Sequence, residues 1–136
     1  MAQSYARLLG EPLLDGVTYP SAAQIWAAEC GLLSHDTQAD PVFNYANRLA
    51  LELFEREFDS MVGLPSRLSS EAQVDHDRIR LLDEVTRHGY IANYSGVRIS
   101  ATGCRFEISG AVVWNLIDEA GVYRGQAAKI TQWRYL

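Results

Sequence analysis

Three histidine positions could supply a metal ligand or transfer a proton. Asp75-His76-Asp77 combines two carboxylates with an imidazole, and His35 and His88 are the other histidines. The first group lies in a polar helical segment, where adjacent residues point in different directions, so we interpret it as a solvated surface. His88 stands at the expected end of that helix, where an imidazole interacts with the free carbonyls. His35 has no partner at ligand spacing, and we expect it in a turn or at a strand edge.

No motif of a known catalytic class accompanies these residues. The sequence contains no glycine-rich phosphate loop, no GxSxG elbow and no HExxH motif. Cys30 and Cys104 lie far apart and outside any CxxC spacing, so we expect two reduced thiols. We therefore predict that the protein is not an enzyme.

Polar residues within apolar, strand-like runs are better candidates for ligand binding. Arg98, Asn115 and Gln126 each interrupt such a run. If their apolar neighbours face the core, period-two alternation turns Arg98 and Asn115 outward, and we favour this interpretation. In the alternative, Arg98 and Gln126 point into an apolar pocket and, together with Arg67, hold a small anionic ligand. Arg67 has a second interpretation, as an anchor that ties its loop to carboxylates or carbonyls.

Composition excludes several classes of protein. With 136 residues, 48% of them hydrophobic and 21% charged, the chain has the size and balance of one soluble domain. A net charge of −5 disfavours binding to nucleic acid or to an anionic membrane surface. No apolar run is long enough to span a membrane, and the N-terminus lacks the features of a signal peptide, so we expect a cytoplasmic protein.

Residues 90–133 are expected to form three antiparallel strands. The turn signals Ala101–Gly103 and Asp118–Gly121 separate three strand-like runs. In the middle run, uninterrupted period-two alternation places Phe106, Ile108, Val112, Trp114 and Leu116 on one face, and Glu107, Ser109 and Asn115 on the other. This pattern predicts that the Trp114 indole lies under the helix that contains Phe54.

The upstream residues are expected to cover this sheet. Ser21 with Gln24 three residues later predicts a capped helix start, and Ser70 with Gln73 predicts another for a long helix that ends at Gly89. Residues 30–35 and 42–45 are strand-like, a helix follows Asn47, a short helical turn begins at residue 59, and residues 64–68 form an extended connector. The prediction is an α+β fold: a five-stranded antiparallel sheet over residues 30–136, with helices mainly on one face, preceded by an N-terminal helical segment, 1–29.

Several segments carry a resemblance to known families. Asp40–Asn47 followed by Ala50–Phe54 resembles the start of a PAS domain, in which a strand ends in an Asn that opens the next helix. Over most of the chain, roughly residues 8–133, the sequence resembles the MEKHLA domain family, which is PAS-like. The matching segments are Leu64–Ser69, Gly89–Ile91, Tyr94–Ser100, Thr102–Gly103, Arg105–Phe106, Val113–Leu116 and Gly125–Ala128.

The resemblance implies a sensing or partner-regulating role and brings no established reaction or catalytic residues. Cys104-Arg105-Phe106 is similar to a motif of flavin-binding PAS domains, but there it lies on a helix, whereas here it follows a hairpin glycine. His88 lies on the helix that supplies the haem ligand in some PAS sensors, yet the helix-end interpretation is favoured. We leave the cofactor unknown and predict that the purified protein is colourless.

The function predicted from the sequence is a non-enzymatic PAS-like sensory, ligand-binding or protein-interaction module that signals through a partner protein. The alternatives are a small enzyme or carrier that uses the same cavity for an anionic or aromatic ligand, and a scaffold with a filled core. A homodimer is expected through the outer sheet face, with the N-terminal helix participating, because Val113 and Ile117 need cover there unless Trp26 supplies it. The candidate ligand-binding residues are Tyr45, Phe54, Arg67, Tyr94, Phe106, Trp114 and Gln126.

Overall fold

The computed structural model describes residues 1–70 and 75–136, with the backbone alone for residues 75–79 and 82. The Asp75-His76-Asp77 side chains and the predicted cap partner Gln73 therefore lie outside the description. The described elements, in chain order, are α1 (Ala2–Leu9), α2 (Ala22–Trp26), β1 (Gly31–His35), β2 (Phe43–Ala46), α3 (Arg48–Phe54), α4 (Phe58–Met61), a 3₁₀ turn (Ser66–Ser69), α5 (Asp75–His88), β3 (Tyr90–Ile99), β4 (Arg105–Ile117), β5 (Tyr123–Ile130) and β6 (Gln132–Tyr135).

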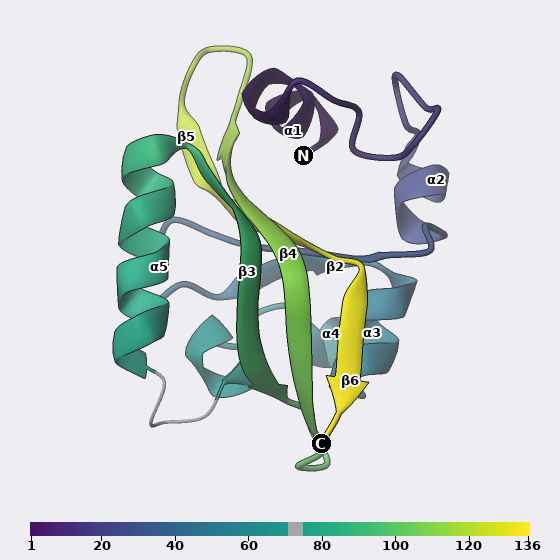
Figure 1. The fold of residues 1–136 in the computed structure, drawn as a ribbon, viewed down its shortest axis with the longest axis vertical. Coiled ribbons are helices and arrows are strands. Elements are labelled where there is room, and N and C mark those ends of the chain that lie inside the picture. Colours follow the sequence, from purple (N-terminus) through teal and green to yellow (C-terminus); the bar gives the residue numbers. More distant parts are fainter. Residues whose placement is uncertain (71–74) are drawn as a thin grey trace.

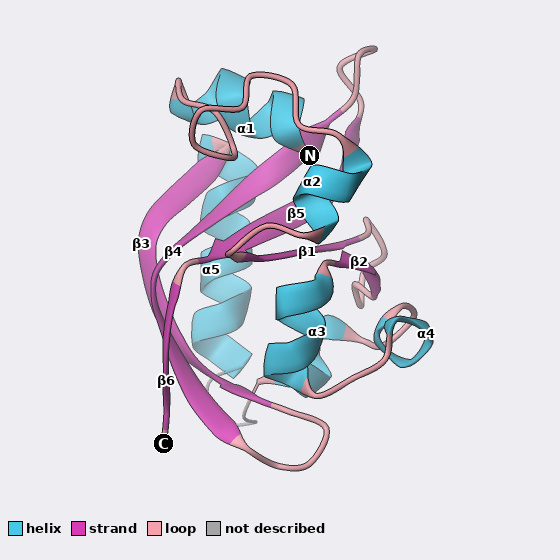
Figure 2. Cartoon of the chain, turned by 90° about the vertical axis from the view of Figure 1, so that its right-hand side faces the viewer, coloured by secondary structure: helices cyan, strands magenta, loops and turns pink. Residues whose placement is uncertain are grey.

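The strands form one antiparallel sheet in the order β2-β1-β5-β4-β3. The predicted antiparallel strands are confirmed, with one more than expected, because β6 pairs with the first half of β4 after β5 has paired with the second half. The sheet is strongly twisted: β3, β4 and β6 run lengthwise while β1 and β2 cross them (Figure 1). Helices α1 and α2 lie on one side of β1, and α3 and α4 lie on the other (Figure 2).

Local sequence signals set the helix ends. The Ser21 hydroxyl accepts from the Gln24 amide, and the Gln24 side chain accepts from the Ser21 amide, so the predicted capping box at α2 is confirmed. Asn47 caps α3, and Gly89, with φ of 91°, follows the last residue of α5. The connector at residues 64–68 is extended only at its start. The Ser69 hydroxyl donates to the Ser66 carbonyl, which favours a 3₁₀ turn there.

Two bulges change which side chains face the helices. Asn93 in β3 and Gly110 in β4 adopt positive φ values of 58° and 63°, and the pairing of β3 with β4 shifts on either side of Tyr94. A bulge adds one residue to a strand, so the face of each later side chain is reversed. The predicted face of Trp114 is therefore wrong: Phe106 and Ile108 share the helix-covered inner face with residues 111, 113 and 115, not with 112, 114 and 116.

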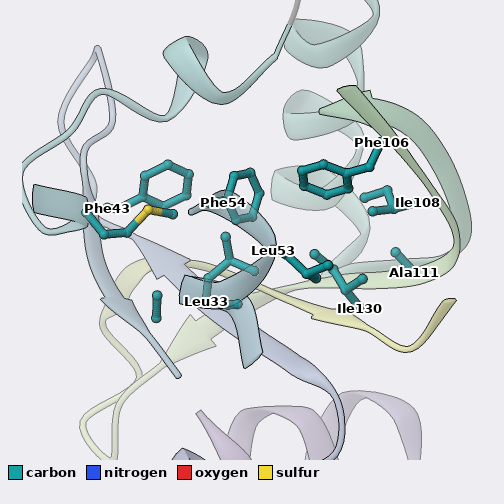
Figure 3. Close-up of a cluster of buried hydrophobic side chains, with 11 residues drawn as sticks. Leu33, Phe43, Leu53, Phe54, Phe106, Ile108, Ala111 and Ile130 are labelled. Carbon is teal, nitrogen blue, oxygen red and sulfur yellow. The ribbon is translucent and has the colours of Figure 1, made fainter. Parts of the chain in front are cut away.

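Two cores result, one on each face of the sheet. The inner core lies beneath α3 and contains Phe54 and Phe106, whose ring centroids are 5.2 Å apart (Figure 3). The outer core lies beneath α1, where the Tyr5 ring packs edge-on against Trp114 at 4.9 Å. Burial raises the pKa of the Tyr5 hydroxyl to about 12, and the Glu11 carboxylate that accepts its hydrogen bond adds to the rise.

The outer face therefore has an intramolecular cover other than the one predicted. Val113 is buried on the inner face beside Val85 of α5, so it needs no cover from a second subunit. Trp26 is 39% exposed and lies 6.4 Å from Phe58 between ring centroids, away from the outer core. Helix α1 takes the role proposed for Trp26, because the Ser4 hydroxyl bonds both the amide and the carbonyl of Ile117.

Candidate functional site

A cavity of about 70 Å³ lies between the inner sheet face and the helices. Its walls are mostly apolar, and small residues explain the space, since Ala111 of β4 and Ala128 of β5 lie where larger residues would fill it. The lining residues are Leu33, Ser34, His35, Phe43, Phe54, Ser66, Ser69, Leu81, Tyr94, Arg98, Ile108, Ala111, Val113, Gln126, Ala127, Ala128 and Ile130.

A row of polar side chains crosses one end of the inner face. Gln126 of β5 pairs across the strands with His35 of β1 and with Asn115 of β4. The Asn115 amide nitrogen donates to the Val85 carbonyl at 2.9 Å, which leaves its oxygen to accept from Gln126 Nε2 at 3.2 Å. Gln126 Nε2 also donates to the Thr86 hydroxyl. The Val85 carbonyl thus fixes the orientation of both amides and ties α5 to the cavity wall.

His35 has a fixed orientation in this row. Its Nδ1 lies 2.9 Å from the Asp36 carbonyl oxygen, and because a carbonyl only accepts, Nδ1 carries the proton. Gly125 of β5 has no side chain, which allows the backbone of His35 to lie close against β5. A Cβ at Gly125 would overlap the His35 carbonyl oxygen, so glycine alone fits there.

The opposite end of the cavity carries a positively charged group. The Arg98 guanidinium donates to the Tyr94 hydroxyl at 3.0 Å and to the Val97 carbonyl at 3.1 Å, and it lies 5.5 Å from the centre of the Tyr94 ring. Gly96 permits this arrangement, because a Cβ there would lie 2.5 Å from the Tyr94 hydroxyl oxygen. Arg98 faces the cavity, so the favoured outward orientation is wrong, because its neighbours Val97 and Ile99 do not belong to the inner core as that prediction assumed.

The structure brings three of the seven candidate residues to the cavity: Phe54, Tyr94 and Gln126. Phe106 is fully buried behind Phe54 but does not line the space. Their proposed contacts with a ligand stay predictions.

The other three candidates lie elsewhere. Trp114 is on the outer face beneath α1. Tyr45 packs against Phe58, with ring centroids 6.2 Å apart. Arg67 forms a salt bridge with Asp40 at 3.2 Å, in which both side chains are about half exposed, so the interpretation of Arg67 as a loop anchor describes its contacts.

The lining residues that sequence reasoning missed include His35, Ser66, Ser69, Ala111 and Ala128. Asn115 was also placed on the wrong face, and it is 7% exposed. The signal that could have corrected the second half of β4 was Gly110, because a glycine within an alternating strand is a common sign of a bulge.

The cavity does not fit a flavin or haem held as the resemblance to cofactor-binding PAS domains would imply. Neither Cys30 nor Cys104 lines it, and His88 is exposed at the end of α5. Within the described residues, no three His, Cys, Asp or Glu side chains are grouped as metal ligands. A space of about 70 Å³ is also far below the several hundred Å³ of a typical cofactor site.

An antiparallel sheet in the order β2-β1-β5-β4-β3, with helices enclosing a small cavity on one face, defines a PAS-like α+β domain. The chain belongs to the MEKHLA domain family, whose model matches residues 1–135. MEKHLA domains and PAS-like domains are in general non-enzymatic, which agrees with the class predicted from the sequence.

One curated relative is the homeobox-leucine zipper protein HOX29 of Oryza sativa subsp. japonica. It is 26% identical over 129 residues, which cover 89% of this chain, and the chain spans only 14% of that protein's length. No described helix is long and apolar enough to cross a membrane.

Solved structures share the fold at low sequence identity. The PAS domain of a Colwellia psychrerythraea protein superposes with a TM-score of 0.70 at 12% identity, covering 85% of this chain and 92% of that one. The fungal blue-light photoreceptor Vivid, described as a light-state dimer, superposes with a TM-score of 0.64 at 18% identity, covering 96% and 92%.

Proposed function

We propose that the protein is a non-catalytic sensory module that binds a small molecule in the inner cavity and signals through a partner protein. The cavity is the observation that carries this proposal. It combines apolar walls with a few oriented polar groups, namely Arg98, Gln126 and His35, and this is the usual composition of a ligand site.

The size of the cavity limits the ligand. An engineered cavity of about 150 Å³ accommodates benzene, so about 70 Å³ accepts roughly three to five non-hydrogen atoms unless the walls move. Such a ligand has few atoms with which to gain affinity. We expect weak, reversible binding, which suits a sensor of metabolite concentration.

The route of the signal is proposed to run through β4 and β5 to α1. Gln126 lines the cavity and donates to Asn115, while Trp114, the neighbour of Asn115 in β4, packs in the outer core. A ligand that shifts the amide pair would move the surface against which Tyr5 packs. The population of docked α1 would then respond to the ligand. Residues 1–29 are thus proposed as an output segment attached to the domain of residues 30–136.

The signal would pass to a second copy or to another protein, and we expect the module to work in the cytoplasm. The part of the outer face that β3 and β6 contribute is the proposed contact, because Val97 alternates with the inward Arg98 and is only half-buried. The dimeric state described for Vivid supports such an assembly. Sedimentation at high micromolar concentration tests it, and a monomer there would oppose the homodimer.

Ligand binding is tested by protein-detected NMR with a library of compounds of about six or fewer non-hydrogen atoms. The readout is the Ala111 methyl resonance, which reports the cavity directly. Ala128→Val fills the space and should abolish the saturable shift. Ala92→Val adds the same two methyl groups on an exposed position of β3 and should retain the shift. If no compound shifts Ala111 in the unmodified protein, the sensory proposal fails and the scaffold interpretation replaces it.

A further inference from the structure

We infer that the cavity ligand is a short aliphatic carboxylate of two to four carbons, held by Arg98. This inference rests on the proposed function and names the chemical class of its ligand. The first observation is that Arg98 has no acidic partner among the residues that the structure describes. The described ion pairs of other arginines are Arg67–Asp40, Arg87–Asp83, Arg124–Asp118 and Arg134–Glu107, and within the described part of the chain no carboxylate pairs with Arg98.

The second observation is the charge of the cavity wall. Among the described residues that line it there is no Asp or Glu, and Arg98 is the described lining residue with a permanent positive charge. Arg98 is half-buried, so its side chain has lost part of its hydration without gaining a counter-ion from the described residues. A bound anion would supply the missing compensation.

The third observation is that the guanidinium is held in place before any ligand arrives. The Tyr94 hydroxyl and the Val97 carbonyl each accept one of its hydrogen bonds, and the Tyr94 ring lies beneath it. Gly96 leaves room for that ring. Two N–H groups are used in this way, and the remaining ones are available to a ligand. Such prior ordering lowers the entropy cost of binding.

The apolar remainder of the cavity selects among anions. Ile108, Ala111 and Ile130 provide walls that cannot hydrogen-bond, so an inorganic oxyanion would be left partly unsatisfied there. A carboxylate with a short alkyl chain satisfies both ends, because the planar guanidinium matches the two carboxylate oxygens and the chain fills the apolar space. The cavity volume of about 70 Å³ limits the chain to a few carbons.

The experiment compares propionate, propionamide, 1-propanol and inorganic phosphate as titrants at pH 7, with the Ala111 methyl shift as readout. Propionate should bind about tenfold to a hundredfold more tightly than propionamide. The reason is that hydrogen bonds between charged groups contribute more free energy than hydrogen bonds to a neutral amide, by an amount that corresponds to this ratio of dissociation constants. Arg98→Gln should remove this preference. Arg67→Gln is the matched control, because Arg67 is exposed and its partner is Asp40, and it should leave propionate binding unchanged.

Two further variants protect the test against misfolding of Arg98→Gln. Arg98→Lys retains the charge without the planar fork and should bind propionate at an intermediate level. Tyr94→Phe removes the hydroxyl that orients the guanidinium and should also weaken binding. Equal affinity for propionate, propionamide and propanol would overturn the carboxylate assignment while cavity binding stands. Equal affinity for phosphate and propionate would also overturn it. Absence of any shift would overturn the inference together with the proposed function.

Discussion

Asn47 offers the sharpest test of how the sheet and helices are joined. Its side chain is fully buried and uses its amide group completely. Oδ1 accepts from the backbone amides of Leu32 and Ala50 at 3.0 and 3.1 Å, and Nδ2 donates to the carbonyls of Ile25 and Cys30 at 3.0 and 2.9 Å. One side chain therefore joins the end of α2, the start of β1 and the start of α3.

Asn47→Ala should lower the free energy of unfolding by about 3 to 4 kcal/mol. Two buried N–H groups lose their acceptor at about 1–2 kcal/mol each, and the two carbonyls add a smaller amount because each retains a second lone pair. Ser21→Ala is the control, since Ser21 makes the same kind of cap at an exposed helix and should cost about 0.5–1 kcal/mol. Urea melts of the two variants give the comparison.

Asn47→Asp separates the two halves of the amide. At an exposed cap this change is nearly neutral. Here the second carboxylate oxygen would face two carbonyl oxygens, which raises the folded-state pKa of that Asp above its unfolded value of about 3.9. The loss of stability is therefore smallest below about pH 4, and it grows as the pH rises from the unfolded-state pKa to the higher folded-state pKa. If Asn47→Asp is neutral at pH 7.5, or if Asn47→Ala costs no more than Ser21→Ala, the reasoning is refuted.

Three further predictions concern other contacts. Trp114→Ala should cost about 3–5 kcal/mol and increase amide exchange in α1, and unchanged exchange there would contradict its placement beneath Tyr5. Gly125→Ala should destabilise the fold severely because its Cβ would meet the His35 carbonyl, whereas Gly121→Ala, with open space around it, should cost only about 1–2 kcal/mol in thermal melts. Hydrogen bonds from Thr102 and Ser100 lower the pKa of Glu55. The Glu55 carboxylate therefore contributes to stability above its usual pKa of 4.5, and this contribution is lost as the pH falls through the lowered pKa. Glu55→Gln should flatten that part of the stability–pH curve, and an unaltered curve would refute this role of Glu55.

Features encoded by neighbouring residues could be predicted from the sequence. The box of Ser21 with Gln24 and the helix start at Asn47 depend on side chains that bond the backbone within three residues, so residue type and spacing suffice. The strands around the two glycine turns were found for the same reason. The resemblance to a known family also allowed the order of the helices and strands along the chain to be predicted.

The faces of the long strands could not be predicted in this way. Period-two counting assigned Trp114 to the inner face because it continued through Gly110, where the structure has a bulge. Arg98 was misassigned because its apolar neighbours Val97 and Ile99 were assumed to face the core, whereas Arg98 lines the cavity. The position of Arg67 depends on Asp40, which lies 27 residues away and is brought near only by the completed fold.

The bulge at Gly110 makes chain length a tighter constraint than residue identity in β4. Deletion of one residue between Ile108 and Ala111 would keep every apolar residue of the strand but reverse the sheet face of each later side chain. Trp114 would then point toward the cavity and Asn115 toward α1. Replacement of several side chains would disturb the domain less than that single deletion. In an alignment of relatives, we expect insertions and deletions to fall in the turns at either end of β4, while the spacing from Phe106 to Leu116 stays constant and position 110 holds a residue that tolerates positive φ.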